Sequence, residues 1–375
     1  MKIGLNLKII LFLIAFFGVN NYVEALELDT VLVNQSVNNQ IADPGSSYKL
    51  TEKGLVREYF KNGIRKSVVA LRPELIFKSR YEVLTENGDN RFAVRNARIG
   101  FKGAVNKEVE YKFMVDLCGA GKFSVLDLYF KFNFLKNRLS FTVGQSGLPI
   151  FNPYTISPSG LDFANRPFIG KFFNSTRDIG LMAEYKIKKD GFPISAQLGI
   201  YNGQGINNDN WAFKPAFGGR ISFGSMNHGF RFTAKGLKIA SSEELDCYIW
   251  GADLRYRGNN FKIETEVMQK YNEYTNLHLL SYYAQAFYCF PIENSSWLSG
   301  IEPAIRWDQI GEEIKDNGFG VSRITTGVNF NLKTGNFKSV FRINYEHFFN
   351  DEVLVTMPKF ADRANKVTAE IMFAF

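Results

Sequence analysis

The last ten residues of the chain, KVTAEIMFAF (366–375), alternate between apolar and polar side chains. Every second residue from Val367 to Phe375 is apolar, and the polar Lys366, Thr368 and Glu370 alternate with the first of them. Alternation with period two is typical of a β-strand that has one apolar face. The pattern recurs in VEYKFMVDL (109–117), with Val115 on the apolar face, and in LDLYFKFNF (126–134), whose apolar face begins at Leu126. The sequence therefore predicts an all-β protein.

The composition of the two strand faces indicates a membrane barrel. The chain contains 36 Phe, 17 Tyr and 4 Trp, and these side chains gather on the apolar faces while full charges occupy the opposite faces. The alternating segments are about 9 to 14 residues long, near the length of a tilted strand that crosses a bilayer, whereas strands of soluble proteins centre on about 5–6 residues. An apolar outside and a polar inside distinguish transmembrane barrels. A secreted soluble β protein is the alternative.

Sixteen segments alternate in this way, and an even number is typical of bacterial single-chain barrels. Turns on one rim are mostly short, and the links on the other rim are longer, with 146–177 the longest; a loop of that length is usually functional. We therefore predict a 16-stranded antiparallel transmembrane β-barrel with short periplasmic turns and long extracellular loops. The predicted strands are 67–80, 91–103, 107–118, 123–134, 137–145, 178–188, 192–201, 214–224, 229–238, 246–257, 259–270, 279–290, 300–310, 321–332, 337–348 and 364–375.

The N-terminal residues predict export. Lys2 and Lys8 precede an apolar run, and Val23-Glu24-Ala25 places small residues where a signal peptidase cleaves. The run is too short to span a bilayer, so we predict a signal peptide over 1–25. The polar residues 26–66 predict a periplasmic extension, in which Leu50 to Phe60 forms a short helix or an extra strand, and the barrel occupies 67–375. The terminal Phe375 is a candidate signal for the barrel-assembly machinery.

The remaining composition excludes several classes of protein. Three Cys and three His are too few for a disulfide framework or a zinc module. The formal net charge of +8 is spread along the chain, so nucleic-acid binding is not expected. No histidine has a catalytic spacing, and we predict neither an enzyme nor a cofactor. The cysteines Cys118, Cys247 and Cys289 leave two alternatives open: two of them pair, or all three are small apolar fillers.

A family resemblance follows from three motifs. RNARIGFKG (95–103), with Glu110-Tyr111-Lys112 and Asp116 after it, LSFTVGQ (139–145) before Pro149, and RDIGLM (177–182) together resemble the phosphate-selective porin O and P family. Weaker similarity covers 251–268 and 326–345, and the Asn- and Phe-rich composition is similar to that of Bacteroidetes-type relatives. The resemblance implies a usually trimeric 16-stranded barrel that carries anions across the bacterial outer membrane.

In barrels of this kind the third long loop folds inward and narrows the lumen. Loop 146–177 contains Arg166, Lys171 and Arg177 against Asp162 alone. Arg binds phosphate-like oxyanions through two hydrogen bonds. We therefore expect these three residues, with Arg98 and Arg231 on the wall, to form an anion-preferring constriction. The alternative is that they form salt bridges or contact lipopolysaccharide at the rim.

The predicted function is a water-filled outer-membrane porin for passive diffusion of small solutes, with a preference for anions such as phosphate. Its expected partners are outer-membrane lipid and lipopolysaccharide, small anions and two further copies of the chain. Two alternatives remain: a barrel that serves as an interaction or adhesion platform, and a general non-selective or sugar-transporting porin.

Overall fold

The computed structural model describes residues 47–375 except 52, 62–63, 120–121, 153–156, 173–174, 190–191, 226, 243–244, 313–320, 336 and 351–363. The signal peptide predicted over 1–25 and the extension up to residue 46 lie outside the described residues. The chain divides into two compact units. Unit 1 comprises residues 1–72 and 103–106, and unit 2 comprises residues 73–102 and 107–375.

Unit 1 contains a β-hairpin. Strand β1 (Ser47–Thr51) pairs antiparallel with β2 (Gly54–Lys61), and β2 pairs with the first residues of β3 (Ile64–Leu84). Thr51 accepts a hydrogen bond from the backbone N–H of Lys53, and its hydroxyl donates to the carbonyl of Gly54, which closes the tight turn. Of the two alternatives for Leu50 to Phe60, the structure therefore shows the extra strand.

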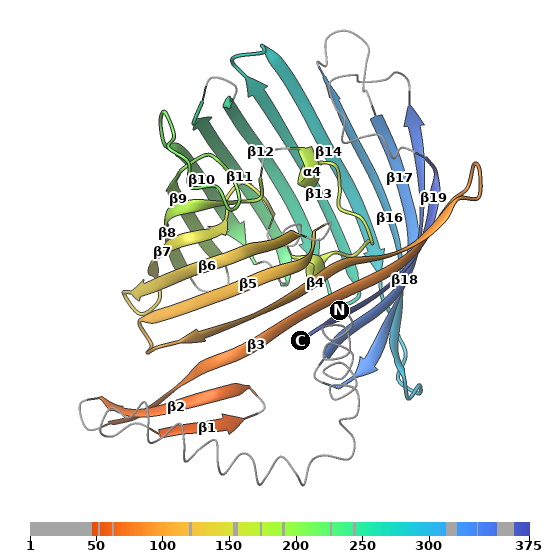
Figure 1. Cartoon of the computed structure of the whole chain (residues 1–375). Helices are drawn as coiled ribbons and strands as arrows, with labels where there is room; N and C mark the ends of the chain where they lie inside the picture. Colours follow the sequence, from red (N-terminus) through yellow and green to blue (C-terminus); the bar gives the residue numbers. More distant parts are fainter. Residues whose placement is uncertain are drawn as a thin grey trace, which may run out of the picture. The chain divides into compact units, whose positions relative to one another are not determined.

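Unit 2 is a closed antiparallel barrel. Among the described residues sixteen strands form the ring, and β19 pairs with β3 from Lys366–Leu84 to Ala374–Ile76, which closes it (Figure 1). The predicted 16-stranded barrel is confirmed. After β3 the strands are β4 (Asn90–Ala104), β5 (Val109–Gly119), β6 (Lys122–Phe134), β7 (Leu139–Gly147), β8 (Arg177–Lys189), β9 (Phe192–Tyr201), β10 (Ala216–Gly224), β11 (Gly229–Ala240), β12 (Asp246–Arg257), β13 (Phe261–Asn272), β14 (Leu277–Tyr288), β16 (Leu298–Glu312), β17 (Val321–Thr334), β18 (Phe337–Asn350) and β19 (Lys366–Ala374). The short β15 (Phe290–Pro291) pairs with β16 and is not counted in the ring.

The two faces of the strands differ as the alternation predicts. Phe130 on β6 and Leu198 on β9 point outward and are 53% and 70% exposed. Glu370 on β19 and its neighbour Arg342 on β18 point inward and are at most 1% exposed. Apolar side chains therefore cover the outside of the ring, and paired charges fill its inside. Among the described residues no helix is both long and apolar enough to cross a bilayer.

The prediction was wrong at one point of the alternation. A β-bulge between β5 and β6 shifts the register at Met114 and Val115. Val115 and Leu126 were expected on the outer face, but they are only 3% and 6% exposed. A bulge places two residues of one strand opposite one residue of its partner, so period two fails there. Beyond the bulge, Asp116 and Asp127 still lie on the inner side.

Two smaller points concern the chain end and the cysteines. The backbone N–H of Phe375 donates to the carbonyl of Leu75 at 2.9 Å, so the pairing of β19 with β3 continues to the last residue. Cys118, Cys247 and Cys289 form no disulfide with one another in this structure. Of the two alternatives, the pairing of two cysteines is therefore not observed.

Gly144 on β7 is the glycine that the barrel wall most requires. Its φ is +119°, and a Cβ at this position would lie 2.3 Å from the backbone carbonyl oxygen of Leu128. The positive φ alone costs an alanine about 1–3 kcal/mol, and because of the close contact with Leu128 we expect Gly144→Ala to cost more than that. Urea unfolding in lipid vesicles measures the loss. The control is Gly88→Ala, at φ +77° in open space; equal losses in both variants would disprove the steric account.

Candidate functional site

The long link between β7 and β8 lies inside the barrel. It carries the 3-10 helix η2 (Pro158–Gly160), which contacts β19, and the short helix α4 (Ile169–Phe172), which contacts β14. Figure 1 shows this link within the ring of strands. Its carbonyl oxygens accept hydrogen bonds from inward-facing side chains, among them Arg342 to Leu161 at 3.0 Å and Asn329 to Asp162 at 2.9 Å. The link therefore occupies part of the lumen on the side of β14 to β19.

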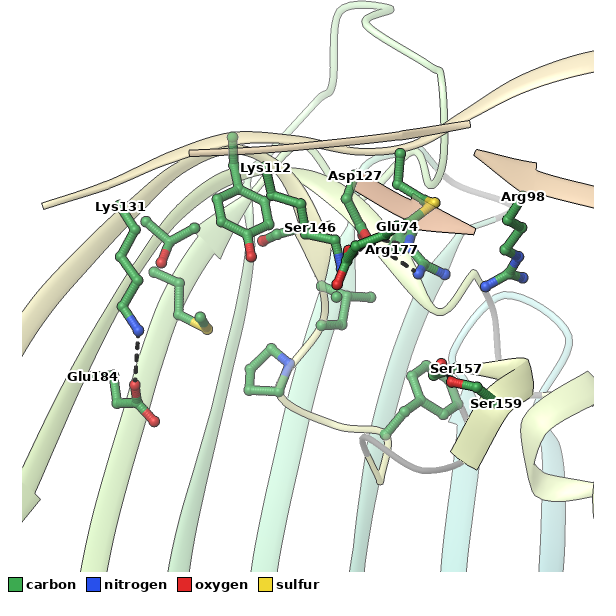
Figure 2. A pocket seen from close by; sticks show the side chains of 18 of the residues that line it. Glu74, Arg98, Lys112, Asp127, Lys131, Ser146, Ser157, Ser159, Arg177 and Glu184 are labelled. Atoms are coloured by element: carbon green, nitrogen blue, oxygen red, sulfur yellow. Dashed lines mark hydrogen bonds and ion pairs between the residues drawn. The ribbon is translucent and has the colours of Figure 1, made fainter. Parts of the chain in front are cut away.

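A cavity of about 440 Å³ remains between this link and the opposite wall (Figure 2). Ser157 and Ser159 line it from the link, and Lys112, Lys131 and Arg177 line it from the strands. Its charged lining consists of five basic and three acidic side chains: Arg98, Lys112, Lys131, Arg177 and Arg220, with Glu74, Asp127 and Glu184. Neutral polar groups between them include Tyr129, Thr142, Ser146 and Gln197. The lining is polar and carries an excess of positive charge.

Most of the lining charges form ion pairs. Lys112 lies 3.3 Å from both Glu74 and Asp127, and Asp127 also accepts from Arg177 at 2.7 Å. Lys131 lies 3.6 Å from Glu184 (Figure 2). These pairs hold the side chains against the wall, and Lys112 and Lys131 remain 24% exposed. Paired cations that keep contact with water still contribute to the local potential.

Arg220 on β10 differs from the other basic residues of the cavity. Its guanidinium donates to the carbonyl oxygen of Phe151 in the link at 3.2 Å. No carboxylate lies within ion-pair distance of Arg220 among the residues that the structure describes. A carbonyl neutralises no charge, so Arg220 supplies the least compensated positive charge of the cavity. Sequence parity places Arg220 on the inner face, but parity alone does not distinguish it from the paired arginines.

Two of the five predicted site residues line the cavity, and the charges of both act on a third, Arg166. Arg98 and Arg177 line the cavity, and Arg98 is bridged to Asp116 at 2.9 Å. Burial, and then the positive charges of Arg98 and Arg177, lower the pKa of Arg166 to about 9. Arg166 is therefore within electrostatic reach of both wall residues and stays protonated at neutral pH.

Of the other two predicted residues, Arg231 lies away from the cavity, and the side chain of Lys171 is not described. Arg231 on β11 is 2% exposed, pairs with Asp253 at 3.2 Å and is not among the lining residues of the cavity. Lys171 lies in α4, and its side chain is outside the described part of the structure. Sequence analysis missed Lys112, Lys131 and Arg220 as cavity residues, although the alternation of their strands puts all three on the inner face.

Three tyrosines lie on the inner side of the wall: Tyr129, Tyr201 and Tyr283. Tyr283 on β14 is fully buried, and its hydroxyl donates to Glu264 at 2.5 Å. Tyr201 is 3% exposed, and Tyr129 lines the cavity. Such scattered positions do not form a continuous aromatic path. Within the described ranges, no cluster of His, Cys, Asp and Glu has a geometry that could hold a metal ion.

Solved porin structures share this fold. The outer membrane channel DcaP of Acinetobacter baumannii is 11% identical with a TM-score of 0.57, over 81% of this chain and 97% of that chain. OmpT of Vibrio cholerae in its trimer form is 12% identical with a TM-score of 0.54, over 82% and 99%. An anion-selective porin from Comamonas acidovorans is 13% identical with a TM-score of 0.54, over 82% and 99%.

At these identities the likeness shows the fold alone. No curated protein matches the chain. The family match comes from residues 71–246, which correspond to the family described as phosphate-selective porin O and P. This stretch includes the three motifs of the resemblance and most of the cavity lining, and the predicted location in the bacterial outer membrane is confirmed with it. Residues 71–246 of the chain thus match the model of the phosphate-selective porin O and P family.

Proposed function

We propose that the chain forms a water-filled channel for passive diffusion of small solutes and prefers anions such as phosphate. The observation that carries this proposal is the cavity of about 440 Å³, whose charged lining has five basic and three acidic side chains. Selectivity of a pore depends on its bore and on the charge of its lining. A low-dielectric wall with one sign of charge in excess concentrates the opposite ion.

The link between β7 and β8 is the proposed constriction. It fills the lumen beside β14 to β19, so solutes pass along the cavity on the other side. In this proposal Arg98, Arg166 and Arg177 add positive charge beside the passage. Arg220, which has no ion pair among the described residues, is the guanidinium that offers hydrogen bonds to an oxyanion. Lys171 is proposed to add charge from α4, and Arg231 to contribute to the potential from the wall.

The assembly belongs to the same proposal. The outward face is apolar and aromatic, which suits outer-membrane lipid and lipopolysaccharide. We propose a homotrimer, as in the trimer form of the OmpT structure, and recognition of the terminal Phe375 strand by the barrel-assembly machinery. The proposed signal peptide over 1–25 would be absent from the mature chain. Native mass spectrometry of detergent-extracted protein tests the trimer; a monomer alone would contradict it.

Liposome swelling tests the transport proposal. Vesicles that contain the purified protein are exposed to an anionic and a cationic solute of equal size, and the rate of swelling is followed by light scattering. We expect faster entry of the anion, because the lining repels the cation. Vesicles without protein are the control. Equal rates for both solutes would contradict the anion preference and indicate a non-selective pore. The absence of swelling would contradict the channel function.

A further inference from the structure

The link between β7 and β8 is bound to the wall through its own backbone. Arg342, Arg306 and Arg323 donate to three of its carbonyl oxygens, those of Leu161 at 3.0 Å, Asn165 at 3.0 Å and Arg166 at 2.9 Å. These three donors come from three neighbouring strands, β18, β16 and β17. A backbone carbonyl is present whatever the side chain, so these contacts fix the path of the link.

The same stretch also donates hydrogen bonds to the wall. The backbone N–H of Ala164 donates to Asn344 Oδ1 at 2.7 Å, and that of Phe168 donates to Asp308 Oδ2 at 3.1 Å. The Asn165 side chain donates to Glu346 at 2.7 Å and accepts from Arg80 at 2.8 Å. Donors and acceptors along residues 161–168 thus find partners on the wall in both directions.

Two phenylalanines of the link stack on wall arginines. The ring of Phe163 lies 4.7 Å from the Arg306 guanidinium and 5.3 Å from the ring of Phe287. The ring of Phe168 lies 4.6 Å from the Arg323 guanidinium. Both rings are at most 3% exposed. Contacts between a cation and a ring are stronger when both are desolvated, so these stacks help to hold the link against the wall.

Carboxylates of the wall also pair with these arginines. Arg323 lies 2.6 Å from Asp308 and 2.5 Å from Glu346, and Arg342 lies 3.6 Å from Glu370. The side chains of Arg306, Arg323 and Arg342 are 1–3% exposed, in contrast to 24% for Lys112 and Lys131 in the cavity. A passing solute therefore meets the cavity residues and not these arginines.

We propose that Arg306, Arg323 and Arg342, with Phe163 and Phe168, form a clamp that holds the link as a fixed part of the channel. These arginines are positioning residues: they set the bore and bind no solute. The proposal rests on the proposed channel function, but it concerns the bore and leaves open which ion the lining prefers. Loosening the clamp should widen the passage.

The double variant Phe163→Ala, Phe168→Ala tests the clamp in planar bilayers. Both rings leave while every charge stays, so we expect roughly a doubling of single-channel conductance with a noisier open state, because the open cross-section governs flow. Phe168→Tyr, which keeps the ring, should conduct as the native protein does. The matched control is Phe213→Ala, since Phe213 also lies near a cation, Lys214 at 5.4 Å, but in another loop. Native conductance in the double variant would overturn the clamp.

A cross-link tests the clamp without any assumption about ions. The background is the full-length chain with Cys118, Cys247 and Cys289 changed to Ala. The pair Ala164→Cys, Asn344→Cys then places thiols on two residues in contact, since the backbone N of Ala164 lies 2.7 Å from Asn344 Oδ1 in the native protein. We expect mild oxidation to join them in nearly every folded barrel, as mass spectrometry would show, and conductance to be equal before and after reduction. Failure to join, or a rise in conductance on reduction, would show a mobile link.

The outcomes separate the two proposals. A barrel that cross-links and conducts but lacks anion preference would keep the clamp and lose the proposed selectivity. A barrel with anion preference whose conductance ignores the ring substitutions, and whose cysteines do not join, would keep the selectivity and lose the clamp.

Discussion

Replacing Arg220 by Gln should lower the anion-to-cation permeability ratio about sevenfold. A unit charge about 7 Å from an ion in water changes the energy of that ion by about 0.6 kcal/mol, with opposite signs for an anion and a cation. Arg220 is the cavity cation without an ion pair in the described part of the chain, and its guanidinium donates to the carbonyl oxygen of Phe151. Its charge is therefore the least compensated one, and Arg220→Glu should lower the ratio by about the same factor again.

Reversal potentials in a salt gradient give this ratio. Arg220→Lys keeps the charge and should retain the native ratio. The control is Arg138→Gln, which removes an exposed arginine from the turn between β6 and β7. Salt screens a charge beyond about 10 Å, so this substitution should change the permeability ratio little. If Arg220→Glu leaves the ratio unchanged, the cavity beside the link is not the path of the ions.

Replacing Val267 by Arg should destabilise the barrel by about 2–4 kcal/mol, the cost of an arginine at the bilayer midplane. Val267 is 43% exposed and lies halfway along β13, between the inward-facing Glu266 and Met268, which are at most 1% exposed. Its side chain therefore meets hydrocarbon, which cannot solvate a charge. Urea unfolding in lipid vesicles, followed by tryptophan fluorescence, measures the loss.

Depth within the bilayer provides the control for this substitution. Phe261 lies on the same face of β13 but at its first residue, and it is 39% exposed. An arginine near the interface costs about 0–1 kcal/mol, so Phe261→Arg should be the milder change. Equal stability of Val267→Arg and the native protein would mean that water, and not lipid, covers this face.

The ring of strands could be predicted from the sequence because each strand repeats one local rule. Side chains alternate between the two faces of a strand, so the outer face can be assigned to Ile371 and the inner face to Glu370 from their positions in the strand alone. The rule failed at Val115 and Leu126, where a β-bulge inserts a residue and no local sequence signal announces it. The structure of Leu50 to Phe60 could not be decided from the sequence, because a short segment is compatible with either a helix or a strand.

The interior of the barrel could be predicted only in part. Parity placed Arg220, Arg231 and Arg323 all on the inner face, but it could not show that Arg231 and Arg323 are paired and Arg220 is not. The clamp joins residues far apart in sequence: Arg323 and Arg166 are 157 positions apart. Such contacts depend on the path of the link across the lumen, and that path is set by the closed barrel and not by the local sequence.

The most direct test of an anion-preferring passage is the reversal potential of the native protein in a planar bilayer with a potassium chloride gradient at neutral pH. The lining of five basic and three acidic side chains predicts a reversal potential shifted toward the equilibrium potential of chloride. A reversal potential shifted toward that of potassium would contradict the account.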